Sequence, residues 1–249
     1  MKNLFNNRLF INLLHPFDKK KRRELRRNLS NDKKIEKLEN FHKYAPLVLK
    51  QLSEAIQSYH KPVKIWLAFG TLLGAYREKN FIAHDMDIDL GIEEDDMTED
   101  FIQHLNKKCF FIYRNFTIYS DQDYLNGFKS EYTFSCKENI LIDIFVFKNS
   151  NGKKESFAFD REEGLNQRET LKKYNGKLRT IKVIFTDFDL VDIDFLGLKF
   201  SAPLNTQLHL SEVYGEDFMT PKVYDFGDRP KDHEHLLDNK TLGLLTYYK

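Results

Sequence analysis

The sequence has few cysteines and no long hydrophobic run. Its two cysteines, Cys109 and Cys136, are too few for a disulfide framework or a zinc site, so we expect two ordinary thiols in a reducing, cytoplasmic environment. The longest apolar stretches, such as residues 65–69 and 144–147, are far shorter than the ~20 residues that a membrane-spanning helix needs. The sequence therefore predicts neither a disulfide scaffold nor a transmembrane helix.

An excess of one sign of charge is also missing from the chain as a whole. Lys and Arg number 39, and Asp and Glu number 38, in 249 residues. This balance argues against a basic protein that binds nucleic acid. Hydrophobic residues at 41% and charged residues at 31% also exclude a wholly disordered chain.

The charge is unevenly distributed along the chain. Residues 1–34 hold 11 Lys and Arg against 3 Asp and Glu, whereas the remainder holds 28 against 35. Apolar residues 9–14 precede the basic cluster at 19–27, the reverse of the order in a secretory signal. The segment is either a peripheral contact with an anionic membrane or a solvated tail that packs a few apolar residues on the body.

Hydrophobic periodicity predicts an α+β chain. Apolar residues at three- and four-residue spacing predict a helix over 35–59, with Pro46 inside it. The acidic run 93–100 is interpreted as structural, because acids are favoured in the first turn of a helix. Residues 153–180 are expected to be partly helical. Further helices are expected at 72–78 and at 204–214, ending at Gly215, and strands at 63–69, 85–92, 109–113, 116–119, 128–136, 140–147, 181–185 and 191–200.

Three aspartates alternate with apolar residues in the predicted strand 85–92. Asp85, Asp87 and Asp89 should therefore point to one face of the sheet. Carboxylates at this spacing can converge on one or two cations, and hard oxygen ligands select Mg²⁺ or Mn²⁺. The similar segment Asp192-Ile193-Asp194 lacks a preceding Gly-Thr turn, so we interpret it as an exposed strand face.

Two further features place phosphate chemistry beside these aspartates. Gly70 and Thr71 stand at a strand-to-helix junction, where glycine allows a ligand to approach and the N–H groups of the helix start favour phosphate. Asp143 interrupts the otherwise apolar strand 140–147 and is costly to bury without a partner or a metal. A phosphate cradle beside a carboxylate metal site is typical of phosphoryl transfer.

Residues 66–90 resemble the signature of the LicD and fukutin-related branch of the nucleotidyltransferase superfamily. That branch has a Gly-Thr-Leu-Leu-Gly-x-x-Arg turn followed by an Asp-x-Asp-x-Asp strand. Residues 142–145, 202–203 and 214–221 are similar to its later motifs, so the resemblance covers about residues 63–222. Ala83-His84 depart from the proline and aromatic residue that the family often has, which should affect the shape of the loop.

The resemblance implies a nucleotidyltransferase (polymerase-beta-like) fold, with a mixed β-sheet flanked by helices and a C-terminal helical extension. It divides the chain into a basic N-terminal segment at 1–34, a catalytic domain at 35–200 and an extension at 201–249 that packs on the catalytic domain.

The resemblance also implies a metal-dependent phosphotransferase. Such an enzyme moves phosphocholine, ribitol phosphate or glycerol phosphate from a CDP-activated alcohol to a hydroxyl of a cell-surface glycan or glycolipid and releases CMP. We expect a bacterial cytoplasmic enzyme at or near the inner face of the membrane, acting on lipopolysaccharide, teichoic acid or capsule. The alternatives are transfer of NMP itself to a small molecule or protein, and a catalytically silent module of a glycan-synthesis complex.

Each candidate residue receives an expected role. Asp87 and Asp89 would hold two Mg²⁺ or Mn²⁺ ions, with Asp85 in support, and Asp143 would complete the second site or accept the proton of the acceptor. Gly70 and Thr71 would contact phosphate. Arg77 would contact phosphate or pair with an acid. His84 is interpreted as a loop residue, and Lys172, Lys173 and Arg179 as a solvated surface or a phosphate-facing patch.

Overall fold

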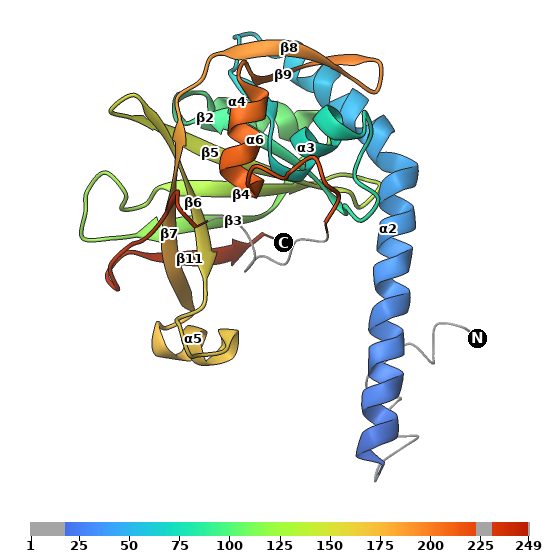
Figure 1. Cartoon of the computed structure of the whole chain (residues 1–249), viewed down its shortest axis with the longest axis vertical. Helices are drawn as coiled ribbons and strands as arrows, with labels where there is room; N and C mark the ends of the chain where they lie inside the picture. Colours follow the sequence, from blue (N-terminus) through green and yellow to red (C-terminus); the bar gives the residue numbers. More distant parts are fainter. Residues whose placement is uncertain (1–17, 223–230, 249) are drawn as a thin grey trace.

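The computed structural model describes residues 18–222 and 231–248 and confirms the α+β class. Figure 1 labels most of its elements. In chain order they are α2 (Lys19–Gln57), β1 (Ile65–Leu67), α3 (Phe69–Arg77), β2 (Asp87–Glu93), the 3₁₀ turn η1 (Glu94–Asp96), α4 (Glu99–Lys107), β3 (Phe111–Tyr119), β4 (Lys129–Ser135), β5 (Leu141–Ser150), β6 (Lys153–Asp160), α5 (Gln167–Lys173), β7 (Lys177–Thr186), β8 (Leu190–Phe195), β9 (Leu198–Pro203), α6 (Thr206–Tyr214), β10 (Glu234–Leu236) and β11 (Leu242–Tyr247).

The strands form one large sheet and a separate β8–β9 hairpin. Strands β2 and β5 run parallel, whereas the other neighbours in the large sheet run antiparallel. The pairing closes on itself in the order β5, β4, β3, β11, β7, β6 and back to β5. The expected mixed sheet is therefore confirmed, whereas its assignment to the nucleotidyltransferase fold stays a prediction.

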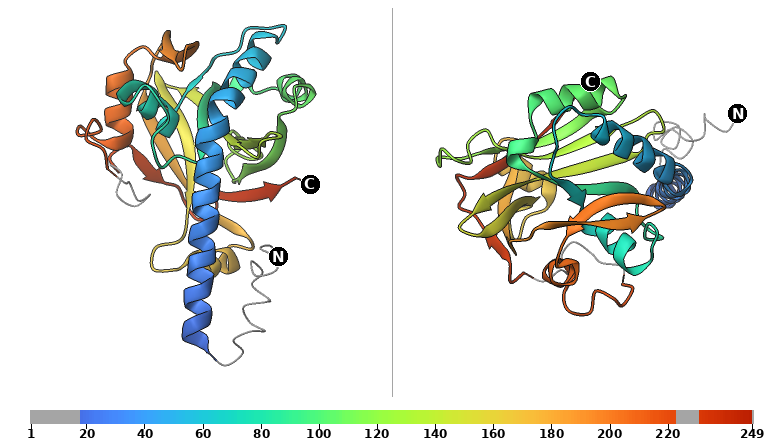
Figure 2. Two further views of the ribbon diagram at one scale, coloured as in Figure 1. Left: turned by 90° about the vertical axis from the view of Figure 1, so that its right-hand side faces the viewer. Right: turned by 90° about the horizontal axis from the view of Figure 1, so that it is seen from above.

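The main core lies between the sheet and the helices α2, α3 and α4. It gathers the apolar faces of these helices against the inward side chains of β2, β4 and β5. In α2, the buried residues Phe41, Ala45, Val48 and Leu52 follow the expected spacing. This packing fixes the C-terminal half of α2 on the body, while its N-terminal half projects beyond it (Figures 1 and 2).

Helix α2 begins 16 residues before the expected start. Its first turn is capped by the side chain of Asp18, which accepts a hydrogen bond from the backbone N–H of Lys21 at 2.8 Å. The core-facing apolar pattern does not reach this part, although Leu29 is buried there, and the helix continues through Lys, Arg, Glu and Leu residues, which favour helix on their own. The basic residues 19–34 are thus helical, whereas the apolar residues 9–14 lie outside the described residues. In the part of the chain that the structure describes, no helix has the length and apolar character to cross a membrane.

Residues 153–180 are partly helical, as expected, because they contain α5, whereas residues 153–160 form strand β6 and pair with β7. Two other expectations about the second half of the chain are wrong. The expected strand 191–200 is a hairpin that turns at Leu196-Gly197, both at positive φ. The region after residue 200 is only partly helical, since β10 and β11 join the large sheet. The division into domains stays a prediction.

The acidic run 93–100 has the structural role that was expected. Glu93 is buried and lies 2.6 Å from Lys154 Nζ. Asp96 accepts a hydrogen bond from the backbone N–H of Lys64 at 2.7 Å, and Asp100 accepts one from Tyr59. These contacts tie the end of β2 and the start of α4 to their neighbours.

Two smaller expectations are also confirmed. Asp192 and Asp194 lie on an exposed strand face, where Asp194 pairs with Lys199 at 2.9 Å. Cys109 and Cys136 are free thiols.

Candidate active site

The structure brings the aspartates of two distant segments onto adjacent strands. Strands β2 and β5 pair in parallel with Asp89 opposite Asp143 and Asp87 opposite Leu141. Side chains at paired positions of a sheet project to the same face, and so do those two residues apart on one strand. Asp87, Asp89 and Asp143 therefore share one face of the sheet near the start of both strands.

The carboxylate of Asp85 lies near that of Asp89, although Asp85 is not on the strand as expected. It precedes β2 instead of belonging to it, and its carboxylate accepts a hydrogen bond from the backbone N–H of Ile82 at 3.3 Å. A Cβ atom added to Gly70 would lie 3.1 Å from Asp89 Oδ2 and 3.4 Å from Asp85 Oδ1. Both carboxylates thus converge over Gly70, where a side chain would crowd them.

Burial and mutual repulsion perturb this group of acids. Burial raises the pKa of Asp89 well above its ordinary value, and the negative charges of its three acidic neighbours Asp87, Asp143 and Asp85 raise it further. Burial, followed by the charge of Asp87, raises the pKa of Asp85 to about 7. Full ionisation of the cluster is therefore costly, and a cation bound among the carboxylates would lower this cost.

Asp143 is held by residues that the sequence did not single out. Its Oδ1 accepts a 2.5 Å hydrogen bond from the hydroxyl of Thr133, and its Oδ2 lies 3.7 Å from the guanidinium of Arg114. Arg114 Nε in turn donates to Thr133 Oγ1 at 2.8 Å. Burial raises the pKa of Asp143, while the Thr133 hydrogen bond and the charge of Arg114 act in the opposite direction.

A fifth acid lies beside this group. Glu131 is on β4, and burial, followed by the charge of Asp143, raises its pKa to about 8. It also lines a cavity of about 210 Å³ whose walls include Phe69, Phe145 and Phe159. No local sequence pattern marks Glu131, Thr133 or Arg114 as residues of the site. Only the pairing of β4 with β3 and β5 brings them to Asp143.

The start of helix α3 supports Asp89 directly. The backbone N–H of Gly70 donates to Asp89 Oδ2 at 3.0 Å, and the backbone N–H of Asp89 donates to Thr71 Oγ1 at 2.8 Å. Thr71 itself is buried. The helix start thus positions a carboxylate of the cluster, and contact of Gly70 or Thr71 with a phosphate stays a prediction.

Arg77 has protein partners at the end of α3. Its guanidinium pairs with Glu78 at 2.7 Å and donates to the carbonyl oxygen of Phe218 at 2.9 Å. The structure thus shows the ion pair that was one of its two expected roles. His84 is exposed in the turn before Asp85.

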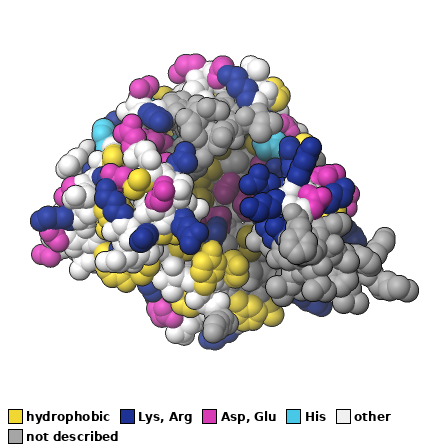
Figure 3. Space-filling view, turned by 90° about the horizontal axis from the view of Figure 1, so that it is seen from below, with side chains coloured by type: hydrophobic (Ala, Val, Ile, Leu, Met, Phe, Trp, Pro, Cys, Tyr) yellow, Lys and Arg dark blue, Asp and Glu magenta, His cyan; other side chains and the backbone are white. Residues whose placement is uncertain are grey.

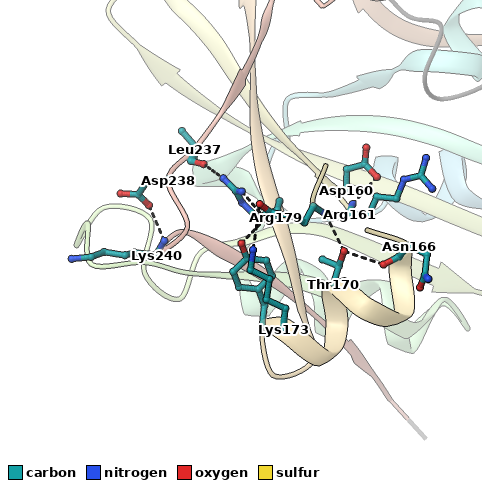
Figure 4. A network of polar contacts seen from close by, with 11 residues as sticks. Asp160, Arg161, Asn166, Thr170, Lys173, Arg179, Leu237, Asp238 and Lys240 are labelled. Carbon is teal, nitrogen blue, oxygen red and sulfur yellow. Dashed lines mark hydrogen bonds and ion pairs between the residues drawn. The ribbon is translucent and has the colours of Figure 1, made fainter. Parts of the chain in front are cut away.

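Two of the basic residues near α5, Lys173 and Arg179, belong to an ion-pair network. Glu162 lies 2.8 Å from Arg179 and 3.5 Å from Lys173, and Arg179 also donates to the carbonyl oxygen of Leu237 (Figure 4). Lys172 is exposed. The network fastens α5 to β7 and to the segment after β10.

Asp85, Asp87, Asp89 and Asp143 form what we call the acid cluster. Their donor atoms are of the chemical type that a divalent cation binds. All are hard carboxylate oxygens, the ligands that Mg²⁺ and Mn²⁺ prefer. Within residues 18–222 and 231–248, no three acidic, histidine or cysteine side chains already stand in the arrangement of a closed metal site. Side-chain rotation would have to complete the ligand set, so metal binding stays a prediction.

The surface view agrees with this arrangement of charge. Figure 3 looks at the side to which the N-terminal half of α2 projects. It shows acidic side chains inside a hollow and Lys and Arg side chains on both sides of it.

Comparison with known proteins finds one family model that matches this region. The model describes the LicD/FKTN/FKRP nucleotidyltransferase domain and matches residues 62–205, more than half of the chain and all four aspartates of the cluster. Three curated relatives bear the name "Ribitol-5-phosphate transferase FKTN". The proteins from Macaca fascicularis and Mus musculus are each 27% identical over 191 residues, and the one from Homo sapiens is 26% identical. The match covers 76% of this chain but 36% of each relative, so the chain spans about a third of their length.

Proposed function

The chain belongs to the LicD/FKTN/FKRP family of nucleotidyltransferase domains, and on this premise we propose that it is a metal-dependent phosphotransferase. It would move an alcohol phosphate from a CDP-activated donor to a hydroxyl of a glycan or glycolipid and release CMP. The observation that carries the proposal is the convergence of Asp85, Asp87, Asp89 and Asp143 from β2, β5 and the loop before β2.

The named relatives favour ribitol phosphate as the transferred group. All three are ribitol-5-phosphate transferases by name, and phosphocholine and glycerol phosphate are the other candidates. The nucleotidyltransferase fold, the CDP donor and a location at the inner face of a membrane belong to the same proposal. The described site supports its phosphate chemistry and does not select the alcohol.

Asp87 and Asp89 would hold Mg²⁺ or Mn²⁺, with Asp85 as a supporting ligand. When bound, the ions would neutralise the diphosphate and the charge that develops on the leaving CMP. Gly70 supports this role by binding Asp89 Oδ2 through its backbone N–H, which keeps that carboxylate turned toward the cluster.

Asp143 would either complete the second metal site or accept the proton of the acceptor hydroxyl. In the transfer, the acceptor oxygen forms a new bond to phosphorus, the bond between that phosphorus and the CMP oxygen breaks, and the hydroxyl proton passes to a base. The raised pKa of Asp143 suits it to this role. Thr133 and Arg114 hold its carboxylate in a fixed orientation from the neighbouring strands.

The test is CMP release from CDP-ribitol in the presence of Mg²⁺. Asp87→Ala and Asp89→Ala should each lower the rate at least ~100-fold, because each removes a ligand for the charge of the diphosphate. Asp192→Ala is the matched control, since it removes an exposed aspartate from an Asp-x-Asp strand without touching the site. Circular dichroism would confirm that every variant is folded.

Two outcomes would contradict the proposal. Near-normal CMP release by the folded Asp87→Ala or Asp89→Ala protein would exclude the carboxylates as the catalytic centre. Transfer of the labelled cytidine to the acceptor, with no free CMP, would show nucleotidyl transfer instead.

A further inference from the structure

Helix α2 carries one continuous stripe that changes from apolar to basic. From Phe41 onward its buried residues, among them Val48 and Leu52, recur every three or four positions and face the core. The same spacing continues toward the N-terminus through residues that are all exposed, namely Lys19, Arg23, Arg26, Arg27, Lys33, Lys34 and Lys37. The side of α2 that packs on the body in its C-terminal half is therefore basic where the helix projects beyond the body (Figures 1 and 2). We call these seven residues the basic stripe.

Acidic residues of the same segment lie elsewhere on the helix. At 100° per residue, Glu24, Asp32, Glu36 and Glu39 fall on the side away from the basic stripe. The segment is thus not a uniformly solvated helix with mixed charges. Most of its positive charges are gathered on the side that continues the packed face, whereas Lys21 lies on the acidic side, 3.2 Å from Glu24, and Leu29 is buried away from the basic stripe.

The basic stripe leads to the acid cluster. Next to its last residue, Asn40 Nδ2 donates to the carbonyl oxygen of Glu138 at 2.8 Å, and His42 Nε2 lies 3.1 Å from the carbonyl oxygen of Ala83. Glu138 precedes β5 and Ala83 precedes β2, so α2 crosses the sheet edge at which both aspartate strands begin. Lys37 is close enough to Asp143 for its charge to lower the pKa of that carboxyl.

We propose that the basic stripe binds the acceptor and that this acceptor is a polyanionic chain bearing several phosphates. This inference rests on the proposed function and adds the class of acceptor. From residue 19 to residue 37 the stripe extends about 27 Å, at 1.5 Å per residue. Such a row of cations can hold several phosphates in succession, while the end of the chain reaches the aspartates.

The direction of the stripe favours a chain over a membrane. A membrane is flat, and it would meet basic residues most readily on an outward, convex face. The basic stripe instead continues the face that packs on the body, beside the hollow that holds acidic side chains (Figure 3). A flexible polyanion can enter the space between the projecting half of α2 and the body, whereas a lipid surface would have to bend to reach it.

The binding test uses linear polyphosphate of about ten phosphates as the probe and orthophosphate as its monomeric counterpart. Arg27→Glu/Lys34→Glu reverses two charges of the basic stripe. Lys43→Glu/Lys50→Glu makes the same change in net charge on the opposite side of α2, where both lysines are exposed. We expect the stripe variant to weaken polyphosphate binding about tenfold or more, because fewer counterions are released, and the control variant to change it less than about twofold.

Three results would overturn the inference. Equal weakening in both variants would show a general charge effect. Binding of orthophosphate as tight as that of polyphosphate would exclude a chain. Stripe-dependent binding to vesicles of phosphatidylglycerol and phosphatidylcholine, without stripe-dependent binding to polyphosphate, would assign the surface to a membrane.

The same proteins separate this inference from the proposed function. Asp89→Ala should lose CMP release and keep polyphosphate binding. If wild-type protein releases no CMP from any CDP-alcohol but binds polyphosphate through the basic stripe, the proposed reaction fails and the binding surface stands.

Discussion

Asp89 shows, at the scale of one residue, that the proposed chemistry requires a buried carboxylate whose negative charge is unfavourable for the fold. Burial and three neighbouring acids raise its pKa, and the hydrogen bond from Gly70 offsets only part of this effect. A sequence under selection for stability alone would not gather such acids. The sequence predicted this grouping correctly, because an Asp-x-Asp strand and a lone Asp in an apolar strand are both local patterns.

Other residues of the site could not be predicted one at a time. Arg114, Thr133 and Glu131 look like ordinary polar positions in alternating strands. Their place beside Asp143 follows from the register of β3, β4 and β5, which the sequence does not specify. Asp85 shows the converse, because its expected position on the strand is wrong although its carboxylate still faces Asp89.

His209 gives a pH-dependent prediction at the residue scale. It is buried beside Phe185 and Phe188, and neither ring nitrogen has a hydrogen-bond partner within the described structure. Burial lowers its pKa to about 4 from the ordinary 6.5. Between pH 6.5 and pH 4, His209 is therefore protonated in the unfolded chain but neutral in the folded protein. Its contribution to the free energy of unfolding is complete above pH 6.5 and is lost as the pH falls toward 4.

The expected loss from His209 is about 2 kcal/mol between pH 7 and pH 4.5. It would be measured as the free energy of urea unfolding of wild type relative to His209→Leu, which cannot titrate. The acids with raised pKa act in the opposite direction, but they are common to both proteins and cancel in the difference. Parallel pH profiles for the two proteins would contradict the prediction.

At the scale of elements, long periodic patterns were predicted better than strand pairing. The core-facing part of α2, the helix ending at Gly215 and the strands β2 and β5 follow their sequence signals. Strand β6 was missed because Lys154 and Glu155 are polar residues buried in ion pairs, which hydrophobic periodicity cannot detect. The N-terminal extension of α2 was missed because it has no apolar stripe of its own.

The pair Lys154–Glu93 joins β6 to β2 and gives a prediction for these elements. Both side chains are buried, Lys154 Nζ lies 2.6 Å from Glu93 Oε1, and Asn149 contacts both. Lys154→Met leaves the Glu93 carboxylate buried without its cation, so we expect the free energy of unfolding to fall by about 3–5 kcal/mol.

Restoring neutrality should recover much of this loss. The double variant Lys154→Met/Glu93→Gln should be clearly more stable in urea unfolding than Lys154→Met alone. If the single variant loses less than about 1 kcal/mol, or if the second change lowers stability further, the pair does not fasten β6 to β2.

At the scale of the whole molecule, the chain closes a ring of strands and sets the acid cluster at its edge. Strand β11, near the C-terminal end, completes the ring between β3 and β7. Helix α2, near the N-terminal end, crosses the edge where β2 and β5 begin. This closure depends on pairings between distant strands, so the sequence predicted the mixed sheet but not the ring.

The central claim is that this cluster binds divalent cations, and Mn²⁺ binding followed by electron paramagnetic resonance in the presence of CDP tests it most directly. We predict that wild type and Asp192→Asn bind Mn²⁺ alike, that Mg²⁺ displaces it, and that Asp89→Asn binds it at least ~10-fold more weakly. Equal binding by Asp89→Asn and wild type, or no binding by wild type, would contradict the account.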